Sequence, residues 1–187
     1  MDTQNITLPK PRILVVDDSR TMRKALRRLL CQEFDVVEAQ DGEEAWKILT
    51  EDHRVQVVFS DLMMPNMNGF QLLRNIRESI HSRINQLPVI IITGHGSLAT
   101  AIDSMHLGAF DYLLKPCENE VLKLRVKRAL KERRLQKKVE SQTRKLEQMA
   151  ITDGLTGLYS RSYFMEALGR EFKHHLRYGS SLSFMMI

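Results

Sequence analysis

The sequence predicts an α/β protein with a five-stranded parallel sheet that is doubly wound, so that helices cover both of its faces. Short apolar runs of strand length alternate with longer amphipathic stretches as far as residue 116, which is the pattern of a parallel α/β sheet. Four of the apolar runs end in a polar or charged side chain, and turn-forming residues separate the runs from the amphipathic stretches. Ligands bind at the carboxyl edge of such a sheet, so these strand ends are where a site is expected.

The order of the elements follows from the hydrophobic pattern. Strands are predicted at residues 12–17, 35–39, 55–60, 88–93 and 110–114, and helices near 19–32, 42–51, 69–79, 97–107 and from 118 onward. Ser19 precedes a stretch with its apolar residues on one face, so it is expected to cap the first helix. Asp41-Gly42 and Gly94-His95-Gly96 are typical of strand-to-helix turns.

Reactive side chains stand at the ends of the predicted strands. The first strand ends in Asp17-Asp18, the third in Asp61, the fourth in Thr93 and the fifth in Lys115. Because the carboxyl ends of parallel strands share one edge of the sheet, three acids, a hydroxyl and an ammonium should converge there.

Such a cluster suits phosphoryl transfer. Clustered carboxylates favour a hard cation with oxygen ligands, and Mg²⁺ typically takes one or two of them and keeps positions for phosphate oxygens. An aspartate can attack phosphorus and form an acyl phosphate. The metal, a lysine and a hydroxyl then neutralise charge on the transferring group. Asp61 is the candidate acceptor, with Lys115 and Thr93 beside it.

These residues resemble the receiver domain of two-component response regulators, over roughly residues 12–130. The matching positions, in chain order, are Asp17, Asp18, Asp61, Thr93, Tyr112, Lys115 and Pro116. The resemblance implies a flavodoxin-like fold and phosphorylation of Asp61 by a sensor histidine kinase or a phosphotransfer protein. It also implies a switch formed by the Thr93 hydroxyl and the Tyr112 ring.

The resemblance further implies how the metal would be held. Asp18, Asp61 and the backbone carbonyl of Met63 would bind Mg²⁺ directly, whereas Asp17 would act mainly through a water. Asp17 is therefore counted with the metal site although it need not touch the ion.

Two positions near the acceptor depart from the family's pattern. Position 63 carries Met where several well-known members have a polar residue, and position 94 is Gly. The small Gly94 leaves an acyl phosphate open to a donor or to water, whereas Met63 and His95 could shield or contact it. The alternative is that His95 is an exposed loop residue and that Met63, Met64 and Met67 are adaptable loop packing. We expect these departures to affect the lifetime of the phosphate.

The composition argues against a membrane protein or a secreted one. The 187 residues are 43% hydrophobic and 27% charged, as in soluble globular proteins. No apolar run approaches the roughly 18 residues that span a bilayer, and residues 1–10 lack the apolar segment of a signal peptide. A cytoplasmic location is expected. Cys31 and Cys117 lack the spacing of a zinc site or redox pair and are interpreted as reduced thiols, with Cys31 packed on a helix.

The net charge of +5 is concentrated in one segment. Residues 123–147 hold eleven of the Lys and Arg residues against three Glu, which gives +8 there and leaves −3 for the rest of the chain. On a single predicted helix this excess is more often a solvated face than a nucleic-acid surface. Nucleic-acid binding is not expected, because no aromatic residues interleave and no reading helix follows.

The helical pattern after Pro116 predicts a stalk. It has no Gly or Pro before Gly154, so the last helix should extend beyond the sheet domain. Apolar residues step by four and three along a seam with one polar interruption, at Leu135, Val139, Gln142, Leu146 and Met149. A parallel two-stranded coiled coil over residues 131–150 is predicted. Flanking like charges, among them Lys137 and Lys138, should keep it only marginally stable.

Residues 151–187 resemble the opening of the diguanylate cyclase (GGDEF) family, whose domain begins with Asp-x-Leu-Thr-x-Leu-x-Asn-Arg after such a stalk. Asp153, Leu155, Thr156, Leu158 and Arg161 match, and Ser160 replaces the usual Asn. A helix to Tyr178 and a strand from Ser181 to Ile187 should follow. The strand would lack a sheet, so this segment is predicted to be poorly ordered or docked on another surface.

The resemblance also limits the activity that is expected here. The family's metal-binding aspartate and its Gly-Gly-Asp/Glu-Glu-Phe turn come after the first strand, and the sequence reaches Ile187 before either of them. No cyclase activity is therefore expected of this polypeptide, whereas an intact parent would make cyclic di-GMP.

The sequence therefore predicts a receiver domain at 10–130, a helical stalk at 131–150 and an incomplete cyclase domain at 151–187. The function expected is a phosphorylation switch that changes dimerisation, through a receiver face and the stalk, and controls cyclic di-GMP synthesis in the parent. The alternative is an adaptor or dimerisation module without catalytic output. A DNA-binding regulator would need a helix-turn-helix after the stalk, and a haloacid-dehalogenase-type phosphatase would need Asp-x-Asp after the first strand; neither is present.

Overall fold

A computed structural model of the chain describes residues 9–94, 97–151, 156–179, 181 and 183. The chain divides into two compact units, Met1–Arg134 and Leu135–Ile187. Each unit is described by itself below. The domain boundaries expected from the sequence, 10–130, 131–150 and 151–187, stay predictions.

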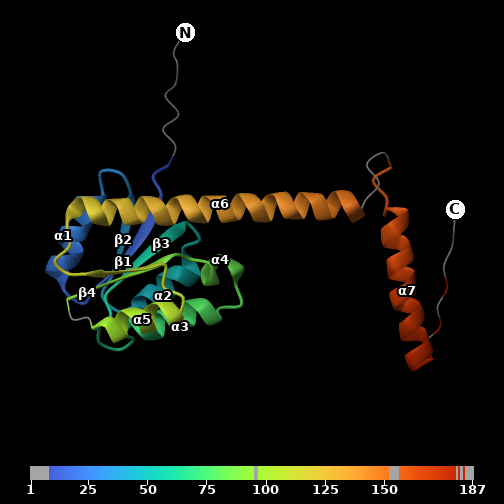
Figure 1. Ribbon diagram of the computed structural model, residues 1–187, viewed down its shortest axis with the longest axis horizontal. Coiled ribbons are helices and arrows are strands. Elements are labelled where there is room, and N and C mark those ends of the chain that lie inside the picture. Colours follow the sequence, from blue (N-terminus) through green and yellow to red (C-terminus); the bar gives the residue numbers. More distant parts are fainter. Residues whose placement is uncertain (1–8, 95–96, 152–155, 180, 182, 184–187) are drawn as a thin grey trace, which may run out of the picture. The chain divides into compact units, whose positions relative to one another are not determined.

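The first unit contains the predicted five-stranded parallel sheet (Figure 1). Its strands are β1 (Arg12–Val16), β2 (Asp35–Ala39), β3 (Val55–Ser60), β4 (Val89–Thr93) and β5 (Asp111–Leu114). Their order in the sheet is β2-β1-β3-β4-β5, and all four neighbouring pairs are parallel. This is the doubly wound order of flavodoxin-like folds, so the predicted fold of this part of the chain is confirmed.

The helices of this unit are α1 (Arg20–Leu30), α2 (Gly42–Glu51), α3 (Gly69–Glu78), α4 (Ser82–Asn85), α5 (Leu98–His106) and the first part of α6 (Asn119–Ile151). The predicted strands and helices are reproduced to within about two residues at each end, apart from α4. That four-residue helix was not predicted, because Ile84 is its only apolar residue and no periodic pattern can form over so short a stretch.

Two apolar cores lie on opposite faces of the sheet. Successive strand residues point to opposite faces, so Leu14 and Val16 join one core whereas Ile13 and Val15 join the other. The first core is covered by α2, α3 and α4, and the second by α1 and α6 (Figure 1). Strands buried on both faces appear in the sequence as continuous apolar runs, and β1, β3 and β4 could be predicted for this reason.

The end of α1 corrects the interpretation of Cys31. The helix is capped as predicted, since the Ser19 side chain accepts a hydrogen bond from the backbone N–H of Met22. The helix ends at Leu30, however, and Cys31 is an exposed C-cap residue instead of one packed on the helix. Leu26 and Leu30 fill the buried face of α1. Burial raises the pKa of the Cys117 thiol, and both cysteines are free.

The long last helix predicted for this part of the chain is present as α6, which has 33 residues. Leu122, Val126 and Ala129 pack into the second core. Arg133 is also buried, and its guanidinium donates to the backbone carbonyls of Arg83 and Gln86 at 3.3 Å each. The start of α6 is therefore an integral part of the first unit.

The later part of α6 carries the predicted apolar seam. Leu135, Val139 and Leu146 are each more than half exposed within the single chain, whereas the side chain of Met149 lies outside the described part. An exposed apolar seam is compatible with a coiled coil between two chains. Helix pairing itself stays a prediction.

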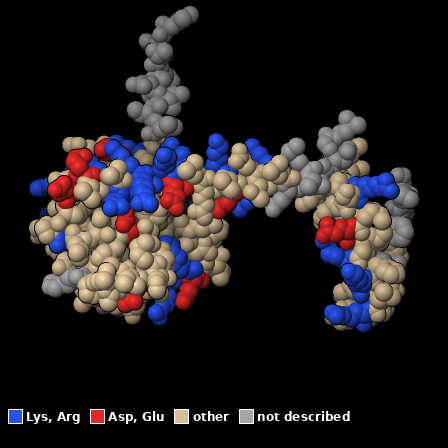
Figure 2. Space-filling view, in the orientation of Figure 1, with Lys and Arg blue, Asp and Glu red and all other residues tan. Residues whose placement is uncertain are grey.

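Cations lie along α6, as expected from the charge count (Figure 2). Several of them fix the first part of α6 within the first unit. Arg125 pairs with Asp111 at 3.0 Å and Lys127 with Glu33 at 2.8 Å, while Arg128 lies over the Phe110 ring. These ion pairs give part of the charge a structural role. Among the described residues, no helix is both long and apolar enough to cross a bilayer.

The second unit contains the rest of α6 and a further helix, α7 (Arg161–Tyr178), which confirms the helix predicted to end at Tyr178. The Ser160 side chain caps α7 by accepting from the Tyr163 N–H, and Gly179 ends it with a positive φ of 66°. No described residue of α7 is buried. Asp153 and Leu155 of the cyclase-like motif lie outside the described residues, as does most of the predicted strand; Ser181 and Ser183 are described and are not in a strand.

Candidate functional site

The sheet itself brings the predicted site residues together. Asp17, Asp61 and Lys115 each follow the last residue of a strand, and Thr93 is the last residue of β4. The hydrogen-bond ladder continues through them: the N–H of Asp61 donates to the Val16 carbonyl at 2.8 Å, and that of Lys115 to the Thr93 carbonyl at 2.9 Å. The backbone on which these side chains stand is therefore fixed by the register of the sheet.

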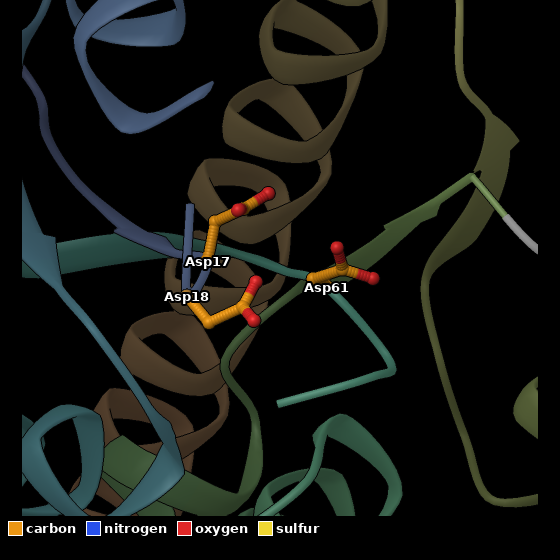
Figure 3. A group of neighbouring side chains, drawn as sticks. All are labelled: Asp17, Asp18 and Asp61. Carbon is orange, nitrogen blue, oxygen red and sulfur yellow. The ribbon is translucent and has the colours of Figure 1, made fainter. Parts of the chain in front are cut away.

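Three carboxylates form a cluster at this edge. Asp17, Asp18 and Asp61 each place an oxygen within 4.8 Å of the oxygens of the other two, and Figure 3 shows them side by side beyond the ends of β1 and β3. Asp17 is only 1% exposed and Asp61 8%, whereas Asp18 faces solvent. Carboxylate oxygens at this spacing, with one open side, fit a Mg²⁺ ion that keeps water or phosphate oxygens among its ligands.

Lys115 connects two of these acids. Its ammonium nitrogen lies 2.6 Å from Asp17 Oδ2 and 2.6 Å from Asp61 Oδ2. Burial alone would lower the pKa of Lys115, but the hydrogen bonds and the charges of Asp17 and Asp61 outweigh it, so the pKa is raised. The lysine therefore stays a cation beside Asp61 at neutral pH.

Asp61 is held through its other oxygen as well. Oδ1 accepts hydrogen bonds from the backbone N–H groups of Leu62 at 2.6 Å and of Met63 at 3.3 Å. Asp17 is fixed in a similar way, because its Oδ1 accepts from the N–H of Ser19 at 2.9 Å. The carboxylates thus have defined orientations before any ligand binds.

The three methionines after Asp61 differ in how far they are buried. Met64 and Met67 pack against the first core, in agreement with their interpretation as loop packing. Met63 does not pack there, and its side chain is 69% exposed. Its predicted backbone contact with Mg²⁺ stays a prediction, and His95 lies outside the described residues.

The two predicted switch residues lie on neighbouring strands. Thr93 is buried at the end of β4, and Tyr112 on β5 is half-buried and paired in register with Ile91. The Tyr112 hydroxyl lies 3.3 Å from the Thr100 hydroxyl on α5. Their roles in a switch stay predictions at this point.

Sequence reasoning treated Asp41 only as part of a turn, but it organises the loop that follows Asp61. Asp41 is buried, caps α2 by accepting from the Glu44 N–H, and accepts from the side-chain amide of Asn66 at 2.7 Å. Asn66 has a positive φ of 59°, a conformation that asparagine tolerates. The cap could have been found from the sequence, because Asp41-Gly42 precedes a helix whose third residue is Glu44. No sequence pattern indicates the hydrogen bond to Asn66.

The Asp41 contacts predict a loss of stability in acid. The backbone hydrogen bond from Glu44 and the side-chain bond from Asn66 lower the pKa of Asp41 below its ordinary value of 3.8. The ionised Asp41 carboxylate therefore contributes to the free energy of unfolding above pH 3.8, and this contribution is lost as the pH falls through the lowered pKa. Denaturant unfolding of Asp41→Asn and of the unsubstituted protein should show a smaller acid-induced change for the variant between pH 5 and roughly pH 2. Equal changes would contradict this role.

Comparisons with known proteins agree with this geometry. The family model described as the response regulator receiver domain matches residues 13–127, more than half of the chain. The chain belongs to the response regulator receiver family. A chemotaxis protein CheY homolog from Campylobacter jejuni is 38% identical over 114 residues, which are 60% of this chain and 86% of that protein. Chemotaxis protein CheY1 of Helicobacter pylori is 39% identical over 114 residues, 60% of this chain and 90% of that protein.

Solved receivers share the fold. A response regulator receiver domain protein from Clostridium thermocellum has a TM-score of 0.62 at 35% identity, over 68% of this chain and 98% of that one. In receiver domains the acidic triad binds Mg²⁺, and Asp17, Asp18 and Asp61 form that triad here. A cognate histidine kinase is implied by the same family. These comparisons do not support the resemblance of residues 151–187 to diguanylate cyclases, which stays a prediction.

Proposed function

We propose that this protein is a two-component response regulator in which Asp61 accepts a phosphoryl group from the histidine of a kinase or phosphotransfer protein. The observation that carries the proposal is the Lys115 ammonium, placed 2.6 Å from both Asp61 and Asp17 within the three-acid cluster. An acidic cluster without a lysine could simply bind an ion that stabilises the fold. A fixed lysine on the same carboxylate adds the second cation that a transferring phosphoryl group needs.

The residues divide the chemistry between them. An oxygen of Asp61 attacks phosphorus, the bond from phosphorus to the donor's histidine nitrogen breaks, and an acyl phosphate remains on Asp61. Mg²⁺, when bound, supplies positive charge to the phosphoryl oxygens, and Asp17, Asp18, Asp61 and the Met63 carbonyl are the groups that would hold it. Lys115 and the Thr93 hydroxyl would contact the remaining phosphoryl oxygens. Asp17 holds Lys115 in place for this role.

The proposed output is a change in association between two copies of the chain. The added charge would draw Thr93 and Lys115 inward, and Tyr112 would follow into the space that Thr93 leaves. The face formed by β4, α5 and β5 would then change its contacts. Apolar side chains are exposed on this face at Leu98, Ile102, Met105 and Leu114, which supports a role in association.

The exposed seam of α6 is the second proposed contact between copies. Its apolar residues favour a parallel coiled coil, while the cations beside them, including Lys131 and Arg134, oppose it. A marginal coiled coil suits a switch, because a small rearrangement of the receiver can then change the population of dimers.

Molar mass in solution tests this output. With Mg²⁺ and beryllofluoride, a stable mimic of the phosphoryl group, we expect the mass to rise from that of a monomer toward that of a dimer. Val139→Lys places a charge in the seam and should reduce the rise, whereas the control Gln136→Lys, at an exposed position beside the seam, should change it less. A monomer under both conditions would remove the dimer step and leave the receiver assignment intact.

We further propose that residues 151–187 begin a diguanylate cyclase domain, so that a complete protein would couple Asp61 phosphorylation to cyclic di-GMP synthesis. The support is the motif residues Thr156 and Leu158, which precede α7, and Arg161, its first residue. The full-length product of the gene, phosphorylated and supplied with GTP, should then form cyclic di-GMP. If the full-length protein forms no cyclic di-GMP, the alternative function as an adaptor is favoured, because an adaptor in the cytoplasm needs only the receiver and the stalk.

A further inference from the structure

A hydrogen bond joins the tyrosine of the proposed switch to a neighbouring helix. The hydroxyls of Tyr112 on β5 and Thr100 on α5 lie 3.3 Å apart, and both residues are half-buried. Thr100 is the third residue of α5, the first helix after Thr93 in the chain. The contact therefore links the fifth strand to the start of the helix on the proposed output face.

The direction of this hydrogen bond follows from the other contacts of Thr100. Its hydroxyl donates to the Ser97 carbonyl at 2.8 Å, and the same oxygen accepts from the Ser97 N–H at 2.8 Å in the capping box of α5. A threonine hydroxyl has one proton and two lone pairs, so its proton is already used and one lone pair remains. The Ser97 hydroxyl lies 3.4 Å from the same oxygen, but Thr100 has no second proton to donate, so in its bond with Tyr112 the tyrosine hydroxyl is the donor.

We propose that Thr100 is a positioning residue that holds Tyr112 against α5 and thereby opposes the inward movement of the ring. The inference rests on the proposed function, in which Tyr112 moves when Asp61 is phosphorylated. The capping box fixes the Thr100 oxygen, so any movement of the ring that carries the Tyr112 hydroxyl away from α5 must break this bond. To populate the inward state, the phosphoryl group must therefore also offset the loss of the hydrogen bond between Tyr112 and Thr100.

The size of the effect follows from the population of the inward state. A ligand that binds one of two states has an apparent affinity reduced by the fraction of molecules in that state. Loss of one partly exposed neutral hydrogen bond changes such an equilibrium by about 2- to 10-fold. Removing the Thr100 hydroxyl should thus tighten beryllofluoride binding by about 2- to 10-fold, provided that the outward state predominates without ligand.

The test is calorimetric titration of the full chain with beryllofluoride in saturating Mg²⁺. Thr100→Val keeps the branched shape without the hydroxyl and should bind more tightly, whereas Thr100→Ser restores the hydroxyl and should return the affinity to that of the unsubstituted protein. Tyr112→Phe removes the donor and should give a similar gain. In the Tyr112→Phe background, Thr100→Val should add nothing, because the bond is already absent.

The outcomes separate this inference from the proposed function. Equal affinity of Thr100→Val and the unsubstituted protein would overturn the inference alone. An equal gain from Thr100→Val with and without the tyrosine hydroxyl would also overturn it, because the effect would then come from the cap of α5. If the unsubstituted protein fails to bind beryllofluoride at all, the proposed function falls, and the role of Thr100 falls with it.

Discussion

Replacing Asp61 by asparagine should abolish phosphoryl incorporation from a small-molecule phosphodonor in the presence of Mg²⁺. The amide keeps the shape of the side chain, but it is not a nucleophile and cannot form the acyl phosphate. It also removes one of the two carboxylates that hold Lys115 at 2.6 Å. We expect labelling to fall to background, a loss of more than about a thousandfold, since removal of a nucleophile leaves little for the other groups to act on.

The control for this experiment is Asp35→Asn. Asp35 is the first residue of β2, at the end of the strands opposite to the acidic cluster, and its ion pair with Arg12 is partly exposed. That variant should be labelled like the unsubstituted protein. Asp61→Asn should stay folded, because removing one acid from a cluster of three relieves repulsion. Retained labelling of a folded Asp61→Asn protein would show that another residue is the acceptor.

The positions of the site residues could be predicted because two rules fix them, one on where a strand ends and one on how parallel strands are arranged. An apolar run buried on both faces ends before the next charged residue, and parallel strands present their carboxyl ends on one edge. Asp17 and Asp61 follow both rules, whereas Lys115 follows only the second, because β5 is only partly buried. The ladder of backbone hydrogen bonds reaches all three. Their convergence is a property of the backbone, which the hydrophobic pattern specifies.

The side-chain partners could not be predicted in the same way. Asp41 reaches Asn66 across 25 positions of the sequence, and Arg133 reaches the carbonyls of Arg83 in α4 and of Gln86 just after it, across 50 and 47 positions. Such contacts depend on where loops and helix ends come to lie in three dimensions. Cys31 illustrates the same point, because a shift of one or two residues in the end of α1 decides whether its thiol is packed or exposed.

Replacing Gly69 by alanine should damage both the stability of the fold and the geometry of Asp61. Gly69 begins α3, and its N–H donates to the Leu62 carbonyl at 3.0 Å. A Cβ at this position would lie well inside contact distance of the Asp61 carbonyl oxygen and 3.0 Å from the Leu62 Cα. Both neighbours are backbone atoms, so no side chain can rotate to relieve the contact.

The clash must be relieved by moving the backbone on which the acceptor stands. That movement would displace the Asp61 carboxylate from Lys115 and from the N–H groups of Leu62 and Met63. Overpacking of a closely packed site costs about 1–3 kcal/mol, and a backbone collision belongs at or above the upper end of that range. Denaturant unfolding should show the loss of stability, and labelling of Asp61 should slow in the fraction that stays folded.

The matched control is Gly169→Ala on α7, where an added Cβ would meet no described atom within 4 Å apart from the neighbouring backbone of its own helix. Alanine is favoured over glycine inside a helix by up to about 1 kcal/mol, so this variant should be neutral or slightly more stable. The same chemical change would then have opposite signs at the two glycines. Equal stability and equal labelling of Gly69→Ala and Gly169→Ala would show that the approach of α3 to the acceptor is not as close as the structure places it.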